Sequence, residues 1–564
     1  GTYLCDWGLL HERYAVFAVH GVWQLGRERC GRERSLEALS SNDQDRAGDP
    51  CERTIARRYL RRILVAGREM ILSPDTPPDG TVRDWLAHRA AEGGTAIAFP
   101  ETNTSLAWAT LQDEALAFAR DLTARGAAKG ESIALAAPNS RDGIVALYGA
   151  LAGGFRVTLI NLAAGRDAIS YGLKHSEARF AFVHTDCAEL FAAANTSDVK
   201  SVALGANVDA ALHDVAANDQ ALLIYTSGTT GRPKGVLHTH SSLLAGGWTA
   251  AIAHDLSPGD RGFCVLPIYH INGLCVTVMG ALVSGGSLAM TSRFSASRFW
   301  SQASAGKATW FSAVPTIISH LLHGDAEPDE VSRARLRFGR SASSALAVET
   351  QSAFEARFSI PIVETMGLTE TAAQILSNPL PPGARKIGSP GIGYGCEVEL
   401  QDTSGLQVAP GVEGEIMVRG PNVMLGYLKN PLANETSFRD GWFRTGDLAR
   451  KDADGYVFVT GRLKELIIKG GENIAPREVD EALYAHPDVV EAAAFARKCR
   501  KYGETVEAAV RLKPGSAING SDLIAICQDR LGSFKSPNII HFMDELPKGP
   551  SGKIQRLKLA EVLS

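Results

Sequence analysis

Residues 225–235 read YTSGTTGRPKG, and this stretch decides which fold the chain is expected to have. It follows four apolar residues, 221–224, and a short apolar run that ends in glycine-rich sequence is typical of a buried strand leading into a loop. The glycines let backbone N–H groups turn toward an anion, while the hydroxyls and the lysine add donors and a positive charge. The plain alternative is a surface turn rich in serine and glycine. We predict a phosphate-binding loop formed by Thr226, Ser227, Gly228, Thr229, Thr230, Gly231 and Lys234.

The composition is that of a globular protein with more than one domain. The chain has 564 residues, of which 21% are charged, and its formal net charge is −4. This balance gives no electrostatic reason to expect nucleic acid binding. The nine cysteines are scattered without metal-binding or CxxC spacing, which favours reduced thiols and a cytoplasmic protein. The longest apolar run, residues 143–155, is too short for a transmembrane segment.

The first 69 residues differ from the rest. They hold twelve arginines, ten acidic residues and no lysine, and the first methionine is Met70. We expect residues 1–69 to be an atypical extension that is disordered or lies upstream of the true start. An organellar presequence is the competing interpretation, but such segments are poor in acidic residues.

From Met70 onward, helical and strand patterns alternate. Helix-like residues 111–124 and 142–153 each precede an apolar strand, at 132–137 and 156–160. Strands that alternate with helices indicate parallel sheets covered by helices. The sequence therefore predicts an α/β fold, with further strands at 261–266, 286–290, 309–313 and 360–364.

Polar groups that suit a nucleotide follow the last of these strands. Residues 360–371 read IPIVETMGLTET, so that Thr369 and Glu370 lie where a strand ends. Ligands collect at the carboxyl ends of strands in open α/β sheets, and a carboxylate is a hard-oxygen ligand for Mg²⁺. Farther on, Asp447 has no evident local structural role, and its carboxylate could accept from both hydroxyls of a ribose. A solvated glutamate at a helix start is the plain alternative for Glu370.

The last 100 residues read as a small α/β unit. A strand at 465–468 leads to Gly470 and Gly471, which would let the backbone approach a thin ligand closely, and a helix begins near Pro476. Lys553 lies near the end of the chain. Taken alone, it would be a solvated charge, just as His270 alone would be a core or loop histidine.

Together these stretches resemble the motifs of the adenylate-forming superfamily, which includes acyl-CoA synthetases, adenylation domains of peptide synthetases and firefly-type luciferases. The resemblance covers nearly everything from Met70 to the end. It implies a large N-terminal domain of helix-covered mixed or parallel sheets plus a β-barrel-like subdomain, hinged at Lys464 to a small C-terminal α/β domain. The implied domains are residues 70–463 and 464–564. The matching strings are YTSGTTGRPKG at 225–235, ETMGLTE at 364–370, GWFRTGD at 441–447, GRLKE at 461–465 and PKGPSGK at 547–553.

The resemblance also implies a role for each motif residue. Lys553 is the catalytic lysine, Thr369 contacts the α-phosphate and Glu370 holds Mg²⁺. Met366 lies beneath the adenine, where the family usually has a tyrosine. The remaining implied roles are ribose contacts for Asp447 and Arg462, a gate between the carboxylate and the thiol tunnel for His270, a hinge at Lys464, and the pantetheine tunnel lining for Gly470 and Gly471.

The implied activity is that of an ATP-dependent acid–CoA ligase, which uses ATP, Mg²⁺ and CoA. A carboxylate becomes reactive once AMP is its leaving group, so the acid is first adenylated with loss of pyrophosphate and then transferred to the thiol. Because Lys553 and the Gly470–Gly471 loop serve different steps, the small domain is expected to rotate about Lys464 between them.

Within the superfamily, residues 293–318, 335–346 and 374–388 are similar to oxalate–CoA ligases and related small-acid synthetases. The His-Gln pair typical of that branch is Ala373-Gln374 here, which weakens the case for a dicarboxylate and leaves an aliphatic or aromatic monocarboxylate open. Loading of a carrier protein's phosphopantetheine arm is the alternative reaction. A non-catalytic adenylate-binding regulator and a luciferase-type oxygenase are less supported. The oligomeric state is open, with a homodimer as one option.

Overall fold

The computed structural model describes residues 72–226, 233–549 and 554–563. Of the preceding residues it describes only the backbone of four short strands, β1 (Val16–Val19), β2 (Val22–Leu25), β3 (Leu64–Val65) and β4 (Arg68–Glu69). β1 pairs with β2, and β3 with β4, in antiparallel fashion. The chain divides into two units, residues 1–60 and 61–564. The rest of the prediction for residues 1–69 lies outside the described residues.

The first large sheet of the second unit has seven strands. Its inner strands are parallel, but β12 runs antiparallel to β11 and β22 antiparallel to β12. The strand order is β10 (Lys200–Ser201), β9 (Phe180–Val183), β7 (Ser132–Ala136), β8 (Arg156–Leu159), β11 (Gln220–Thr226), β12 (Lys234–Thr239) and β22 (Gly426–Tyr427).

The second large sheet has nine strands, parallel from β17 to β5 with antiparallel strands at both edges. Its order is β19 (Ile392–Gly393), β18 (Ala373–Ser377), β17 (Ile362–Leu368), β16 (Phe338–Ser341), β15 (Trp310–Ala313), β13 (Arg261–Cys264), β14 (Ser287–Met290), β5 (Thr95–Phe99) and β6 (Thr104–Ala107).

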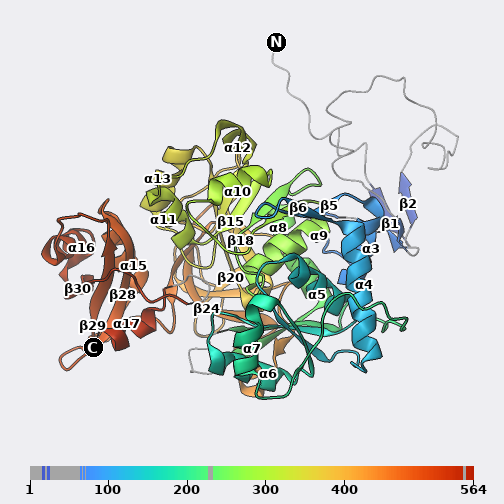
Figure 1. Ribbon diagram of the computed structural model, residues 1–564. Coiled ribbons are helices and arrows are strands. Elements are labelled where there is room, and N and C mark those ends of the chain that lie inside the picture. Colours follow the sequence, from blue (N-terminus) through green and yellow to red (C-terminus); the bar gives the residue numbers. More distant parts are fainter. Residues whose placement is uncertain are drawn as a thin grey trace, which may run out of the picture. The chain divides into compact units, whose positions relative to one another are not determined.

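Helices pack against both faces of these sheets (Figure 1). The main core lies between the sheets and includes α3 (Val82–Glu92), α4 (Trp108–Ala124), α5 (Arg141–Ala152), α8 (His240–Ala253), the π-helix η3 (Asn272–Met279) and α9 (Gly280–Ser284). The outer face of the seven-stranded sheet carries α6 (Arg166–Ser176) and α7 (Ala188–Ala194), which follows the short turn η2 (Thr185–Cys187). The outer face of the other carries α10 (Phe299–Ala305), α11 (Pro315–His323) and α13 (Val348–Phe358), with α12 (Glu330–Arg335) beside α10.

Two smaller sheets complete the unit. An antiparallel sheet, the part expected to resemble a barrel, contains β20 (Glu397–Gln401), β21 (Gly414–Arg419), β23 (Phe438–Arg439), β24 (Trp442–Lys451) and β25 (Val457–Arg462), with α14 (Pro431–Ser437) before β23. The C-terminal sheet, drawn in orange to red in Figure 1, contains β26 (Ile467–Lys469), β27 (Glu472–Ile474), β28 (Val489–Cys499), β29 (Gly503–Leu512) and β30 (Ile539–Phe542). The helices α15 (Pro476–Tyr484), α16 (Gly520–Lys535) and α17 (Arg556–Val562) cover it.

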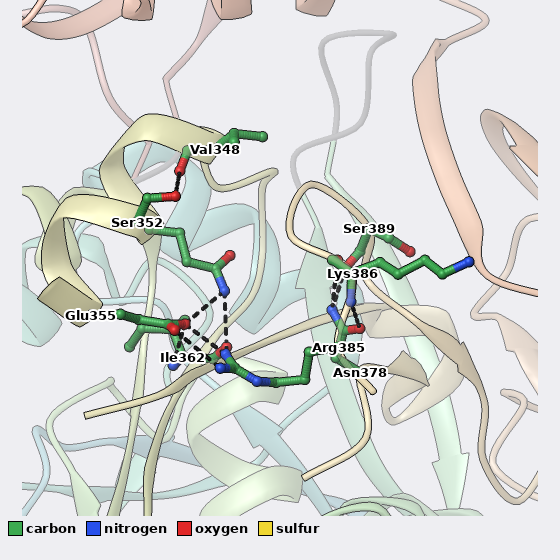
Figure 2. Close-up of polar contacts among 9 residues, drawn as sticks. Val348, Ser352, Glu355, Ile362, Asn378, Arg385, Lys386 and Ser389 are labelled. Carbon is green, nitrogen blue, oxygen red and sulfur yellow. Dashed lines mark hydrogen bonds and ion pairs between the residues drawn. The ribbon is translucent and has the colours of Figure 1, made fainter. Parts of the chain in front are cut away.

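The segment between β18 and β19 is tied to its neighbours by a charged network (Figure 2). Arg385 donates to both carboxylate oxygens of Glu355 on α13, at 2.6 and 3.0 Å, and to the carbonyl of Ile362 at 2.8 Å. Asn378 closes the segment by donating to the carbonyl of Ser389 at 2.5 Å. These contacts fix the chain just ahead of Pro390, which lines one of the cavities described below.

The α/β prediction is confirmed, and each predicted strand and helix has a counterpart within a few residues. The antiparallel strand β12 was not predicted. Only residues 227–233 separate it from β11, and so short a connection is typical of antiparallel neighbours, because parallel ones need a longer crossover. Across the described ranges, the longest apolar helices fall short of what a bilayer crossing requires.

Candidate active site

Two adjoining cavities hold most of the predicted site residues. The larger, of about 1190 Å³, is lined by Thr226, Lys234, His270, Thr369, Glu370, Arg462 and Lys464. The smaller, of about 240 Å³, is lined by Met366, Asp447 and Arg462. Because Arg462 lines both, the two cavities are neighbours. Gly470 and Gly471 line neither cavity. The predictions for Ser227, Gly228, Thr229, Thr230, Gly231 and Lys553 fall outside the described residues.

The signature loop connects two paired strands. Thr226 at the end of β11 faces Lys234 at the start of β12 in the antiparallel register. Both residues line the larger cavity, so the ends of the loop lie at its edge. The ammonium of Lys234 lies 4.6 Å from the ring centroid of Tyr427, within the range of a cation–π contact.

Thr369 and Glu370 form the short turn η4 (Thr369–Thr371) directly after β17. The ring of His238 on β12 places Nε2 2.7 Å from the Thr369 carbonyl. Burial lowers the pKa of His238 to about 4, so the neutral ring donates from Nε2 to that carbonyl. The backbone N–H of Met424 donates to the Glu370 carbonyl at 2.8 Å, and this turn is therefore held from two sides.

The carboxylate of Glu370 fits a magnesium ion that bridges phosphates. Mg²⁺ keeps most of its octahedral ligands as phosphate oxygens and water, so one or two protein carboxylates are enough. No group of three or more ligating His, Cys, Asp or Glu side chains occurs among the described residues. Tyr427 donates to Oε1 of Glu370 at 2.8 Å.

The two residues expected at the ribose are paired with each other. Arg462 donates to Asp447 through Nε at 2.6 Å and through Nη2 at 3.0 Å, across the β24–β25 register. Burial lowers the pKa of Arg462, but the Asp447 carboxylate outweighs this and the net shift is upward. The structural role of Asp447 comes from strand pairing and not from its local sequence, because the pairing brings a residue 15 positions away directly opposite it.

A buried glutamate lies in the smaller cavity beside Met366. Glu364 is 2% exposed, and its Oε1 accepts from the backbone N–H of Leu346 at 3.2 Å. Its Oε2 is buried and has no hydrogen-bond partner among the described residues. Burial raises the pKa of Glu364 to about 7.

A buried arginine also lines the larger cavity. Arg340 on β16 is 1% exposed and lines this cavity. It donates to Oδ1 of Asn272 at 2.8 Å, to Oγ of Ser312 at 3.2 Å and to Oε1 of Gln374 at 3.3 Å. These partners are all uncharged, and no carboxylate within the described ranges forms an ion pair with Arg340.

Residues that follow the C-terminal sheet in the chain line the same cavity. Lys548 and Gly549 line it together with Gln555 and Lys558. Lys548 pairs with Ile554 in an isolated bridge, and its ammonium lies 2.7 Å from Oε1 of the buried Glu491.

Arg340, Tyr427, Glu364 and His238 were not singled out from the sequence. An arginine within an apolar strand, in the sequence FGRSA at 338–342, was the one available signal for Arg340. The other three owe their positions to contacts between distant segments.

Comparison with known proteins shows which family the chain belongs to. Residues 86–428 match the AMP-binding enzyme family, and residues 478–553 match the AMP-binding enzyme C-terminal domain. Sulfoacetate–CoA ligase of Cupriavidus necator is 44% identical over 497 residues, which span 85% of this chain and 97% of that protein. Oxalate–CoA ligase of Arabidopsis thaliana is 41% identical over 347 residues, 61% of this chain and 68% of that protein. The crystal structure of ATP-bound MatB from Rhodopseudomonas palustris superposes with a TM-score of 0.79 at 28% identity, covering 86% of this chain and 99% of that one.

The chain therefore belongs to the AMP-binding enzyme family, as its motifs predicted. Within that family it is an acyl-CoA synthetase, an ATP-dependent acid–CoA ligase that uses ATP, Mg²⁺ and CoA.

Proposed function

We propose that the acid this ligase activates is a small one that carries a second, permanently anionic group, a sulfonate or a carboxylate. The observation that carries the proposal is the guanidinium of Arg340, buried in the cavity without an acidic partner. Burial lowers the pKa of Arg340 to about 9, which leaves it charged at neutral pH. A buried charge without a partner costs several kcal/mol, and an anionic substrate group would offset that cost.

The neighbours of Arg340 favour an anion with several acceptor oxygens. The guanidinium already donates to Asn272, Ser312 and Gln374, which hold it in one orientation. Ala373, which also lines the cavity, replaces the histidine of the oxalate branch and removes a second bulky polar group. A tetrahedral sulfonate is larger than a carboxylate, and alanine at position 373 leaves more room for it than histidine would. The 44% identity to a sulfoacetate–CoA ligase supports the same class.

We further propose that the motif residues take the roles their resemblance implies. The acid's reacting carboxylate would attack the α-phosphorus of ATP, with Lys553 bridging the two groups and Thr369 donating to the α-phosphate. Lys234 and the loop 226–231 would hold the departing pyrophosphate. Mg²⁺ on Glu370 would neutralise charge on the phosphates. No general base is needed, since the attacking carboxylate is already ionised, and the chemistry consists of positioning and charge stabilisation.

The nucleoside would occupy the smaller cavity. Met366 would pack against the adenine through its thioether, and the Asp447 carboxylate, held by Arg462, would accept from the ribose hydroxyls. His270 would separate the acid from the thiol tunnel. Gly470 and Gly471 have φ values of 60° and 88°, which glycine adopts without strain, and would line that tunnel in a second orientation of the C-terminal domain.

The proposed domains are residues 70–463 and 464–564, with the hinge at Lys464. The two family matches end at residue 428 and begin again at residue 478, which supports a boundary between them. Lys464 itself is exposed. A cytoplasmic location and a homodimeric assembly remain proposals, which fractionation and light scattering would test.

The substrate proposal is tested by measuring acid-dependent AMP release with ATP and CoA. Sulfoacetate, oxalate and malonate are compared with acetate, propionate and benzoate, in the wild type and in Arg340→Met. Arg337→Met is the matched control, because Arg337 lies three residues earlier and pairs with Asp260 away from the cavity. The wild type should prefer the doubly anionic acids by about 100-fold or more in kcat/KM, which a buried charge pair can supply.

The preference should collapse in Arg340→Met and persist in Arg337→Met. Equal turnover of acetate and the doubly anionic acids by the wild type would refute the substrate class. Turnover of free CoA in the same assay separates the ligase from a carrier-protein loading enzyme.

A further inference from the structure

Tyr427 lies in β22, the strand that pairs with β12 next to the end of the signature loop. β22 pairs with β12, the strand that begins at Lys234, and the N–H of Leu428 donates to the Gly235 carbonyl at 2.8 Å. Asn434 fixes the backbone of Tyr427 by accepting from its N–H at 2.7 Å and donating to its carbonyl at 3.0 Å. Tyr427 thus has a rigid backbone directly beside the lysine of the signature loop.

The side chain of Tyr427 lies between a cation and an anion of the site. Its hydroxyl donates to Oε1 of Glu370 at 2.8 Å, and its ring lies 4.6 Å from the ammonium of Lys234. The residue is 6% exposed.

Lys234 and Glu370 carry opposite charges, line the same cavity and contact the same tyrosine. Across the described ranges, however, neither forms an ion pair. The aromatic face offers the ammonium an electron-rich partner, while the hydroxyl takes one oxygen of the carboxylate. A direct Lys234–Glu370 pair would occupy the groups needed for phosphate and for the cation.

We propose that Tyr427 is a positioning residue that keeps Lys234 and Glu370 from pairing with each other, so that the ammonium remains available to phosphate and the carboxylate to Mg²⁺. This assignment rests on the proposed roles of those two residues. Tyr427 itself contacts neither nucleotide nor acid in this scheme.

Tyr427→Phe tests the idea, because it keeps the ring against Lys234 and removes only the hydroxyl. Tyr456→Phe is a matched control: the Tyr456 hydroxyl donates to the Ala384 carbonyl at 2.5 Å, its ring lies 4.6 Å from the ammonium of Lys386, and it lines neither cavity. The Mg²⁺ concentration for half-maximal ATP–pyrophosphate exchange should rise about tenfold in Tyr427→Phe, the factor expected for losing one hydrogen bond to a charged group. The Mg²⁺ concentration for half-maximal exchange should not change in Tyr456→Phe, and the KM for the acid should not change in either variant.

A binding measurement decides the matter independently of turnover. The extra thermal stabilisation by Mg·ATP over ATP with EDTA should shrink in Tyr427→Phe, because a ligand that binds more weakly stabilises the folded state less. In a Lys234→Met background the same tyrosine substitution should no longer matter, since no ammonium is left to compete for Glu370.

An unchanged Mg²⁺ dependence in Tyr427→Phe, or an equal effect with and without Lys234, would overturn the assignment. Should the wild type fail to exchange pyrophosphate with every acid, the proposed function would fall, and the thermal measurement would still decide the role of Tyr427.

Discussion

Replacing Glu364 by glutamine should make the protein more stable, and increasingly so as the pH rises. The Glu364 carboxyl group is buried at the smaller cavity, with one oxygen bonded to the N–H of Leu346 and the other without a hydrogen bond among the described residues. A charged form is poorly solvated there, so burial raises the pKa from its ordinary 4.5 to about 7. Glutamine has the same shape, keeps the bond from Leu346 and carries no charge at any pH.

The sign and size of the effect follow from proton linkage. The folded state binds the Glu364 proton more tightly than the unfolded state, so this group favours folding at low pH and the advantage is lost as the pH rises through about 7. At 1.36 kcal/mol per pKa unit the whole loss is about 3 kcal/mol, of which about 2 kcal/mol falls between pH 5.5 and 8. The Glu364→Gln variant should therefore gain about 2 kcal/mol relative to the wild type over that range.

Urea and thermal unfolding of both proteins at half-unit steps from pH 5.5 to 8.5 would measure the difference. Glu413→Gln is the control, because Glu413 is exposed and its substitution should leave the pH profile unchanged. A constant difference between Glu364→Gln and the wild type across the range would show that Glu364 is ionised in the folded state and would refute the reasoning.

Three further substitutions probe the proposed mechanism. Lys553→Ala should reduce ATP–pyrophosphate exchange by about 100-fold or more, because removing charge stabilisation at the reacting centre has an effect of that size. The variant should largely keep thioester formation from a supplied acyl-adenylate. Equal loss in both half-reactions would show that Lys553 does not serve adenylation alone. Asp447→Asn should raise the KM for ATP about tenfold. It should also lower the free energy of unfolding by about 1–3 kcal/mol, because the Arg462 guanidinium loses its charged partner. An unchanged KM for ATP would show that Asp447 does not contact the ribose. Lys464→Pro should slow CoA-dependent turnover more than ATP–pyrophosphate exchange, because the fixed φ of proline restricts a hinge. Equal slowing of the two reactions would place the hinge at another residue.

Local patterns were sufficient to predict much of the fold. Apolar runs bounded by polar or glycine residues located the strand at 132–137, observed as Ser132–Ala136, and the helix at 142–153, observed as Arg141–Ala152. The strand predicted at 465–468 is observed at Ile467–Lys469, because the N–H of Glu465 closes a turn onto Arg462 instead. Boundaries shifted where such a turn competed with the strand.

The chemistry of the site was predictable only in part. Glu370 lies in the turn directly after β17 and Asp447 lies within β24, and both belong to motifs that could be recognised from the chain alone. The Tyr427–Glu370 hydrogen bond joins residues 57 positions apart, and the Arg340–Asn272 bond joins residues 68 positions apart. Such pairs depend on which strands become neighbours, and neither hydropathy nor spacing along the sequence encodes that order.

The contacts around the C-terminal sheet bear on how one enzyme could serve two half-reactions. Lys548 and Gly549 line the larger cavity, whereas Gly470 and Gly471 do not, so the role proposed for these two glycines in the thiol tunnel requires the C-terminal domain to take a second orientation. On the described residues, the polar contacts of the C-terminal domain with the rest include hydrogen bonds from Arg477 to the carbonyls of Val459 at 2.8 Å and Gly388 at 3.3 Å, one from Ser319 to the carbonyl of Val490 at 3.4 Å, and the ion pair of Arg530 with Glu349 at 4.0 Å. Each such hydrogen bond is worth about 0.5–3 kcal/mol and can be exchanged for water. Under the proposed alternation, these polar contacts would be exchanged for hydrogen bonds with water as the C-terminal domain rotates, which keeps their contribution to the cost of rotation modest.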